Sequence, residues 1–131
     1  MKHINFRELS SFVSIVLLSI SLTRIWSMNL YYIFAHDPGF IEAFSSDPWH
    51  HYQVWLLIIV VAYLLRKVKN TKIAYAVGIG MFLEEWPVFL NDLGFDTNSL
   101  YHSWLDFIAI MGVVGIIYMI SRVLERRNAP S

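Results

Sequence analysis

Four long stretches dominated by apolar residues make up most of this chain, with short polar segments between them. The stretches at 54–65 and 107–120 hold no charged residue over about three or more helical turns. A soluble helical bundle needs a polar face on each helix, and these stretches offer none. The pattern predicts an all-α integral membrane four-helix bundle that forms a single domain over residues 1–131.

Turn and capping signals divide the pattern into four transmembrane helices at about 8–36, 48–67, 72–91 and 99–124. Asp37-Pro38 and Asp47-Pro48 each resemble a helix N-cap followed by a first-turn proline. We therefore expect a short interfacial helix between the first two spans and the start of the second span at Pro48. Asn70-Thr71 fits a tight turn, and Pro87 predicts a kink because proline removes one backbone hydrogen bond.

The basic residues predict the orientation of the helices. If the N-terminus is cytoplasmic and the chain crosses four times, nine of the ten Lys and Arg residues lie on the cytoplasmic side, with Arg24 as the exception. The positive-inside rule favours that arrangement over its inverse. We therefore expect a multi-pass protein of the cell membrane with both termini cytoplasmic.

The amino-acid composition limits the kinds of binding partner that this chain is expected to have. Charged residues make up 15% of the chain and the formal net charge is zero, so nucleic acid is not an expected partner. Membrane lipids are expected partners, and a homo-oligomer is a further expectation. The absence of cysteine excludes disulfides, thiolate metal ligands and iron–sulfur clusters.

Carboxylates and histidines gather toward the predicted outer side. Glu84, Glu85 and Asp106 lie at membrane depth, where a charged side chain costs a few kcal/mol and usually faces a partner or a water-filled cavity. Helical spacing brings further polar side chains to the same level from the other helices. The additional candidates are Asn29, His36, His50, His51, Asp92 and His102.

Histidine and carboxylate together are typical ligands of Zn, Fe and Mn ions. The spacing His102-x-x-x-Asp106 places two such ligands on one helix face. The candidate metal ligands are His50, His51, Glu85, His102 and Asp106, with Glu84 and Glu85 as candidate catalytic bases. A carboxylate–histidine network without metal and an outer polar surface without a shared pocket are the alternatives.

Arg24 is expected to reach Glu84 as a buried ion pair, or else to snorkel toward the membrane surface. Small residues in the third and fourth spans predict close helix contacts. These residues are Gly78, Gly80, Gly112 and Gly115.

The pair Glu84-Glu85, followed by His102-x-x-x-Asp106, resembles two motifs of the CAAX-type intramembrane proteases. The resemblance covers these two short motifs, and Phe89 stands where the first motif has an arginine. It implies water chemistry activated by a glutamate.

These features favour a metal-dependent membrane hydrolase or oxidoreductase that acts on a lipid-soluble or membrane-embedded substrate. The first alternative is a small proton- or ion-coupled transporter or channel subunit that uses Glu84, Glu85 and Arg24. The second is a membrane assembly subunit without chemistry of its own. Haem bound by two of His36, His51 and His102 is less favoured, since carboxylates surround these histidines.

Overall fold

The computed structural model describes residues 5–45, 50–68, 70–101 and 103–128, and all regular structure in these ranges is helical. The prediction of an all-α chain is therefore confirmed. The helices are α1 (Phe6–Phe34), α2 (Pro38–Ser45), α3 (His51–Leu64), α4 (Thr71–Glu84), α5 (Trp86–Asp92), the 3-10 turn η1 (Asn98–Leu100) and α6 (Trp104–Arg127).

Length and composition make two of the described helices, α1 and α6, candidate membrane spans on their own. The helices α4 and α5 qualify only as one broken span, bent by 65° between them, and α3 is an apolar helix of 14 residues. The described residues thus hold two candidate spans, or three if the bent pair crosses as one, and the predicted four spans are not confirmed.

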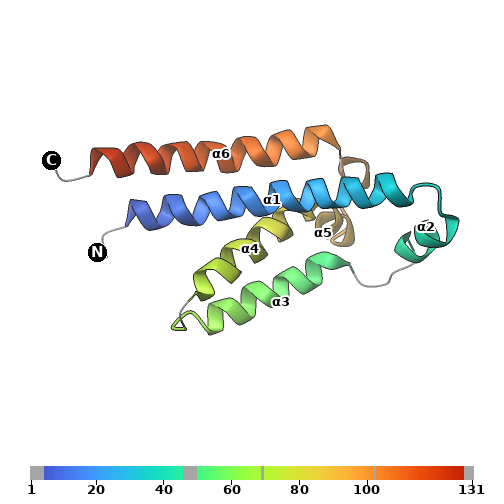
Figure 1. The fold of residues 1–131 in the computed structure, drawn as a ribbon, viewed down its shortest axis with the longest axis horizontal. Coiled ribbons are helices and arrows are strands. Elements are labelled where there is room, and N and C mark those ends of the chain that lie inside the picture. Colours follow the sequence, from blue (N-terminus) through green and yellow to red (C-terminus); the bar gives the residue numbers. More distant parts are fainter. Residues whose placement is uncertain (1–4, 46–49, 69, 102, 129–131) are drawn as a thin grey trace.

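The long helices lie side by side in an ordered row. Figure 1 shows α1 between α6 and α4, with α3 packed on the other side of α4. Both chain ends and the α3–α4 turn lie at one end, called here the termini end, whereas α2 lies at the other, the α2 end. Six buried apolar residues from α1, α4 and α6 form the core between them: Val13, Val16, Ile20, Ala76, Ile110 and Val114.

Side-chain caps explain where several helices begin. Asn5 accepts a hydrogen bond from the backbone of Glu8 at the start of α1. Asp37 accepts a hydrogen bond from the backbone of Gly39 and so begins α2, the short helix predicted at this position. Asn70 adopts a left-handed φ of 71°, which makes the tight turn before α4. The predicted cap at Asp47 lies outside the described residues.

The third predicted helix breaks where its proline indicated. Glu85 leaves the helical conformation with φ −103° and ψ 14°, and α5 begins one residue later with Pro87 in its first turn. Proline is compatible with that position because first-turn N–H groups have no partner within the helix. The kink is therefore confirmed, and it places the adjacent Glu84 and Glu85 at a helix break.

Glycines let α4 approach its two neighbours closely. A Cβ on Gly80 would lie 2.8 Å from the Val16 carbonyl oxygen of α1, and one on Gly78 would lie 3.0 Å from Ile59 of α3. Both predicted contacts are confirmed. The same prediction is wrong for Gly112 and Gly115 within this chain, because nothing lies within 4 Å of the corresponding Cβ positions on α6.

Large apolar side chains cover the outside of the row. Trp26 of α1, Leu57 of α3 and Ile116 of α6 each expose more than half of their surface, and many neighbours on these helices do the same. Contiguous apolar surface of this extent is unfavourable in water and is expected for helices that face lipid.

Candidate functional site

A buried arginine joins three helices. Arg24 of α1 places Nε 2.8 Å from Glu84 Oε1 of α4 and Nη2 2.6 Å from Asp106 Oδ2 of α6. All three residues are at most 4% exposed. The Arg24 guanidinium also lies 5.3 Å from the centre of the Phe107 ring, a distance suited to a cation–π contact. The expected Arg24–Glu84 ion pair is confirmed, and Asp106 is a partner that the spacing had not indicated.

Asp106 owes its position to the start of α6. Ser103 caps this helix by accepting a hydrogen bond from the Asp106 backbone N–H at 3.0 Å. The Asp106 carboxylate is then directed toward α1 and α5, where Trp86 donates its indole N–H to Oδ1. Both carboxylate oxygens are thereby occupied, one by the indole and one by Arg24.

Glu85 sits at the break between α4 and α5 and is only 6% exposed. The indole of Trp55 lies beside it. His51, at the start of α3, places Nδ1 3.6 Å from Glu85 Oε1 while more than half of its own side chain remains exposed. His51 therefore connects the buried glutamate to the surface. We call Arg24, Glu84, Glu85 and Asp106 the Arg24 cluster.

A second polar group flanks the first on the α2 side. Tyr52 donates a hydrogen bond of 2.6 Å to Asp92 Oδ2, and His50 Nε2 lies 3.6 Å from the same oxygen. The rings of His50 and Tyr52 stack with their centres 5.8 Å apart. These contacts join the start of α3 to the end of α5 and so hold the bent segment against the bundle.

Tyr101, in the loop before α6, lies close enough to the cluster to experience its charges. Burial raises the pKa of the Tyr101 phenol, and the nearby carboxylates of Glu85 and Glu84 raise it further. The phenol thus stays protonated at physiological pH and can donate a hydrogen bond.

The structure brings together part of the predicted set. Glu84 and Asp106 both contact Arg24, whereas Glu85 lies next to Glu84 in the chain and faces His51. His50 faces Asp92 instead. Asn29 and His36, by contrast, are exposed on the α2 half of the molecule. His102 lies outside the described residues. Among those that are described, no group of three or more His, Asp and Glu side chains is arranged to hold a metal ion.

Aromatic partners were missed by the sequence reasoning. Trp55, Trp86 and Tyr101 each border the cluster, and none of them was among the predicted site residues. The Arg24–Asp106 contact had one available signal. Arg24 is the sole basic residue outside the predicted cytoplasmic segments. A buried acid in the predicted outer half of the bundle therefore had no other Lys or Arg with which to form an ion pair.

In comparisons with known proteins, no protein-family model, no curated protein and no solved structure matches this chain.

Proposed function

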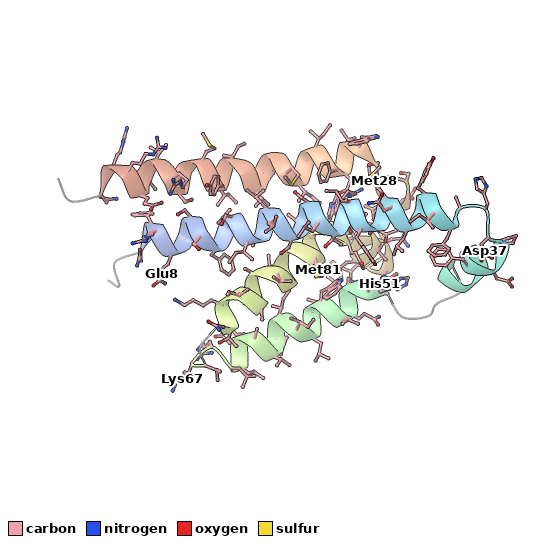
Figure 2. The ribbon with its side chains drawn as sticks, in the orientation of Figure 1. Glu8, Met28, Asp37, His51, Lys67 and Met81 are labelled. Atoms are coloured by element: carbon pink, nitrogen blue, oxygen red, sulfur yellow. The ribbon has the colours of Figure 1, made fainter. Side chains whose placement is uncertain are left out.

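We propose that this chain is a multi-pass membrane protein with both termini cytoplasmic, in which α1, α3, the α4–α5 pair and α6 each cross the membrane. The two long apolar helices and the many exposed apolar side chains support membrane insertion. Figure 2 supports the orientation, since Lys67 lies at the termini end and His51 and Asp37 lie toward the α2 end. The short α3 fits if the bilayer thins locally, at a modest free-energy cost.

Within that orientation, the chain acts as a subunit of a cation-coupled transporter, and the observation that carries this proposal is the charge balance of the Arg24 cluster. Three carboxylates are buried with one guanidinium. An uncompensated buried charge costs several kcal/mol, so the cluster favours uptake of a second positive charge. Glu85, which borders His51 and the surface, is the group that would receive it.

The helix break supports a transport role over a purely structural one. Interrupted helices at membrane depth occur in transporters, where the break supports ion and substrate sites. Here the 65° bend falls at Glu85, inside the cluster. Glu84, next to Glu85 in the chain, is the α4 residue that contacts Arg24. A cation bound beside Glu85 that also neutralises Glu84 would weaken this contact, so the angle between α4 and α5 would change when the cation binds.

The opposite half of the described bundle is closed by apolar packing. Val16, Ile20 and Ala76 are at most 4% exposed at the crossing of α1 and α4. Passage through the membrane therefore requires rearrangement or an interface between copies. A homo-oligomer joined along an exposed apolar face of the bundle meets that need.

Reconstituted vesicles test the transport claim. Under an imposed membrane potential, wild-type protein should carry protons or sodium ions above the protein-free rate, as followed by ion-sensitive dyes. Glu85→Gln should abolish that flux, whereas Glu8→Gln, a matched change at the termini end, should leave it intact. Wild-type flux equal to that of empty vesicles would refute transport, while cation binding would still be measured separately.

A metal-dependent enzyme is the second candidate, and the His51–Glu85 contact favours it. Imidazole and carboxylate 3.6 Å apart suit two ligands of one Zn or Fe ion, with a lipid-soluble substrate reaching it from the outer leaflet. The remaining described residues fit less well, since Asp106 is occupied by Arg24 and Trp86. Metal content of purified wild type and His51→Ala separates this candidate from the first. Stoichiometric metal that the substitution removes would favour the enzyme.

A further inference from the structure

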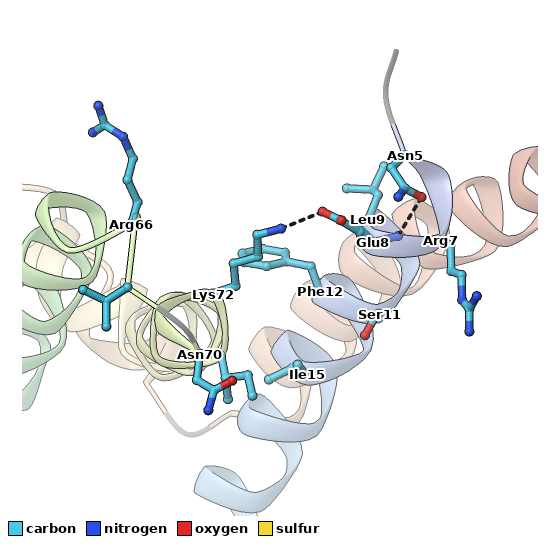
Figure 3. Close-up of a pocket in the computed structure, with 12 residues that line it drawn as sticks. Asn5, Arg7, Glu8, Leu9, Ser11, Phe12, Ile15, Arg66, Asn70 and Lys72 are labelled. Atoms are coloured by element: carbon cyan, nitrogen blue, oxygen red, sulfur yellow. Dashed lines mark hydrogen bonds and ion pairs between the residues drawn. The ribbon is translucent and has the colours of Figure 1, made fainter. Parts of the chain in front are cut away.

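A groove of about 870 Å³ opens at the termini end, between the first turns of α1 and the α3–α4 turn. Figure 3 shows Lys72 of α4 and Glu8 of α1 facing each other across it, with Arg66 on the α3 side. The groove is far from the Arg24 cluster and shares no residue with it. It therefore calls for an explanation of its own.

The polar rim of this groove carries excess positive charge. Arg7, Arg66 and Lys72 line it together with one acid, Glu8, whose carboxylate lies 2.7 Å from the Lys72 ammonium. Among the described residues, neither Arg7 nor Arg66 forms an ion pair. The Arg66 guanidinium lies 4.5 Å from the centre of the Tyr63 ring and donates one hydrogen bond to the Tyr63 carbonyl, and the side chain is exposed to solvent.

The floor of the groove is apolar. Leu9, Phe12 and Ile15 follow one side of α1, and Ile73 faces them from α4. Leu9 and Ile73 remain at least 36% exposed, and Phe12 packs its ring 5.9 Å from that of Tyr75. A ligand that fills the groove would thus meet cations at the rim and hydrocarbon below it.

We propose that this groove binds one anionic phospholipid of the cytoplasmic leaflet. Its phosphate would lie between Arg66 and Lys72, and an acyl chain would cover Phe12 and Ile73. Basic pockets between helices on the cytoplasmic side suit anionic head groups, and the apolar floor selects a lipid over free phosphate. The inference rests on the orientation proposed above and is independent of cation coupling.

Lipid binding to the delipidated full-length protein, measured by native mass spectrometry in detergent, tests the proposal. Phosphatidylglycerol should bind in preference to phosphatidylcholine with the same acyl chains. The double change Arg66→Gln/Lys72→Gln should weaken phosphatidylglycerol binding roughly 30-fold, since each interfacial basic residue contributes about a factor of five. Arg126→Gln/Arg127→Gln removes the same charge from the end of α6 and should leave binding nearly unchanged.

Glu8→Gln provides a change of opposite sign. It releases Lys72 and removes the one acid of the groove, so phosphatidylglycerol should bind about five-fold more tightly. Ile73→Ser should weaken the lipid but not glycerol phosphate, which lacks acyl chains. Equal binding of the two lipids, equal losses in both double variants, or glycerol phosphate binding as strong as the lipid would each overturn the proposal. Because all substituted polar side chains are exposed, circular dichroism should report unchanged helix content.

Discussion

The two ends of this bundle both hold ion pairs between basic and acidic side chains, but the pairs differ in their exposure to water. Toward the α2 end, Arg24 holds Glu84 and Asp106 in contacts that are almost fully buried. At the termini end, Lys72 and Glu8 approach within 2.7 Å, yet their side chains are 75% and 61% exposed. Water screens the second pair and supplies alternative partners, whereas the first has only its own members. Burial of the charged side chains, rather than the type of charge, therefore determines how much an ion pair contributes to the stability of the fold.

The largest effect is expected from removing the buried cation. Arg24→Gln leaves Glu84 and Asp106 without their common partner, and breaking a buried pair from one side costs about 3–5 kcal/mol. Unfolding of the detergent-solubilised protein with increasing denaturing detergent measures this loss. The triple variant Arg24→Met/Glu84→Leu/Asp106→Leu, which removes both signs of charge, should recover much of the stability. An Arg24→Gln protein as stable as wild type would contradict the claim that the buried ion pairs contribute more to stability than the exposed pair.

A smaller effect is expected at the crossing that separates the two regions. Gly80→Ala places a methyl group 2.8 Å from the Val16 carbonyl oxygen, and backbone cannot yield as a side chain can. Overpacking of this kind costs about 1–3 kcal/mol. Gly112→Ala is the matched control on α6, where the Cβ meets open space, and it should leave the same unfolding transition unchanged or slightly stabilised. Equal losses in the two variants would contradict the close α1–α4 approach.

Tyr101 offers a pH-dependent comparison. Burial, with the cluster carboxylates, raises its pKa above the ordinary value of 10.0. Its contribution to stability should be complete below the pKa of an unfolded tyrosine and should be lost as the pH rises through the higher folded value. Ultraviolet difference titration of wild type against Tyr101→Phe measures this. A phenolate signal at or below the ordinary value would show that Tyr101 does not sense the cluster.

The smallest effect is expected at the exposed pair. Lys72→Gln should change the free energy of unfolding by less than about 1 kcal/mol, because exposed ion pairs contribute little. The same denaturing-detergent titration, at low and high salt, provides the comparison with Arg24→Gln. A loss at Lys72 as large as that at Arg24 would mean that burial does not separate the two regions.

Local signals in the sequence predicted much of the fold. Asp37-Pro38 opens α2, Asn70 turns the chain before α4, and Pro87 breaks the third helix. These features depend on neighbouring residues, which is why a pattern could reveal them. The number of membrane spans was harder to predict from the sequence, because α3 is shorter than the helix predicted at 48–67 and α4 is bent away from α5.

The sequence predicted the Arg24–Glu84 pair but not the Arg24–Asp106 pair. Glu84, Glu85 and Asp106 were recognised because charge at membrane depth demands a partner. The Ser103 cap at the start of α6 is a local contact that the sequence could have indicated, but the partner of each carboxylate also depends on helix rotation and packing, which spacing does not encode. The same limit explains why Gly112 and Gly115 were assigned to contacts that this chain does not make on its own.

Cation binding at the Arg24 cluster is tested most directly by the fluorescence of Trp55 and Trp86, which border Glu85 and Asp106. In purified wild type, titration with protons, sodium ions or zinc ions should change the emission along a saturable one-site curve for one of these cations. Glu85→Gln should abolish that response, while Glu8→Gln should retain it. A wild-type emission that responds to none of the three, or a response that survives Glu85→Gln, would contradict a second cation in the cluster.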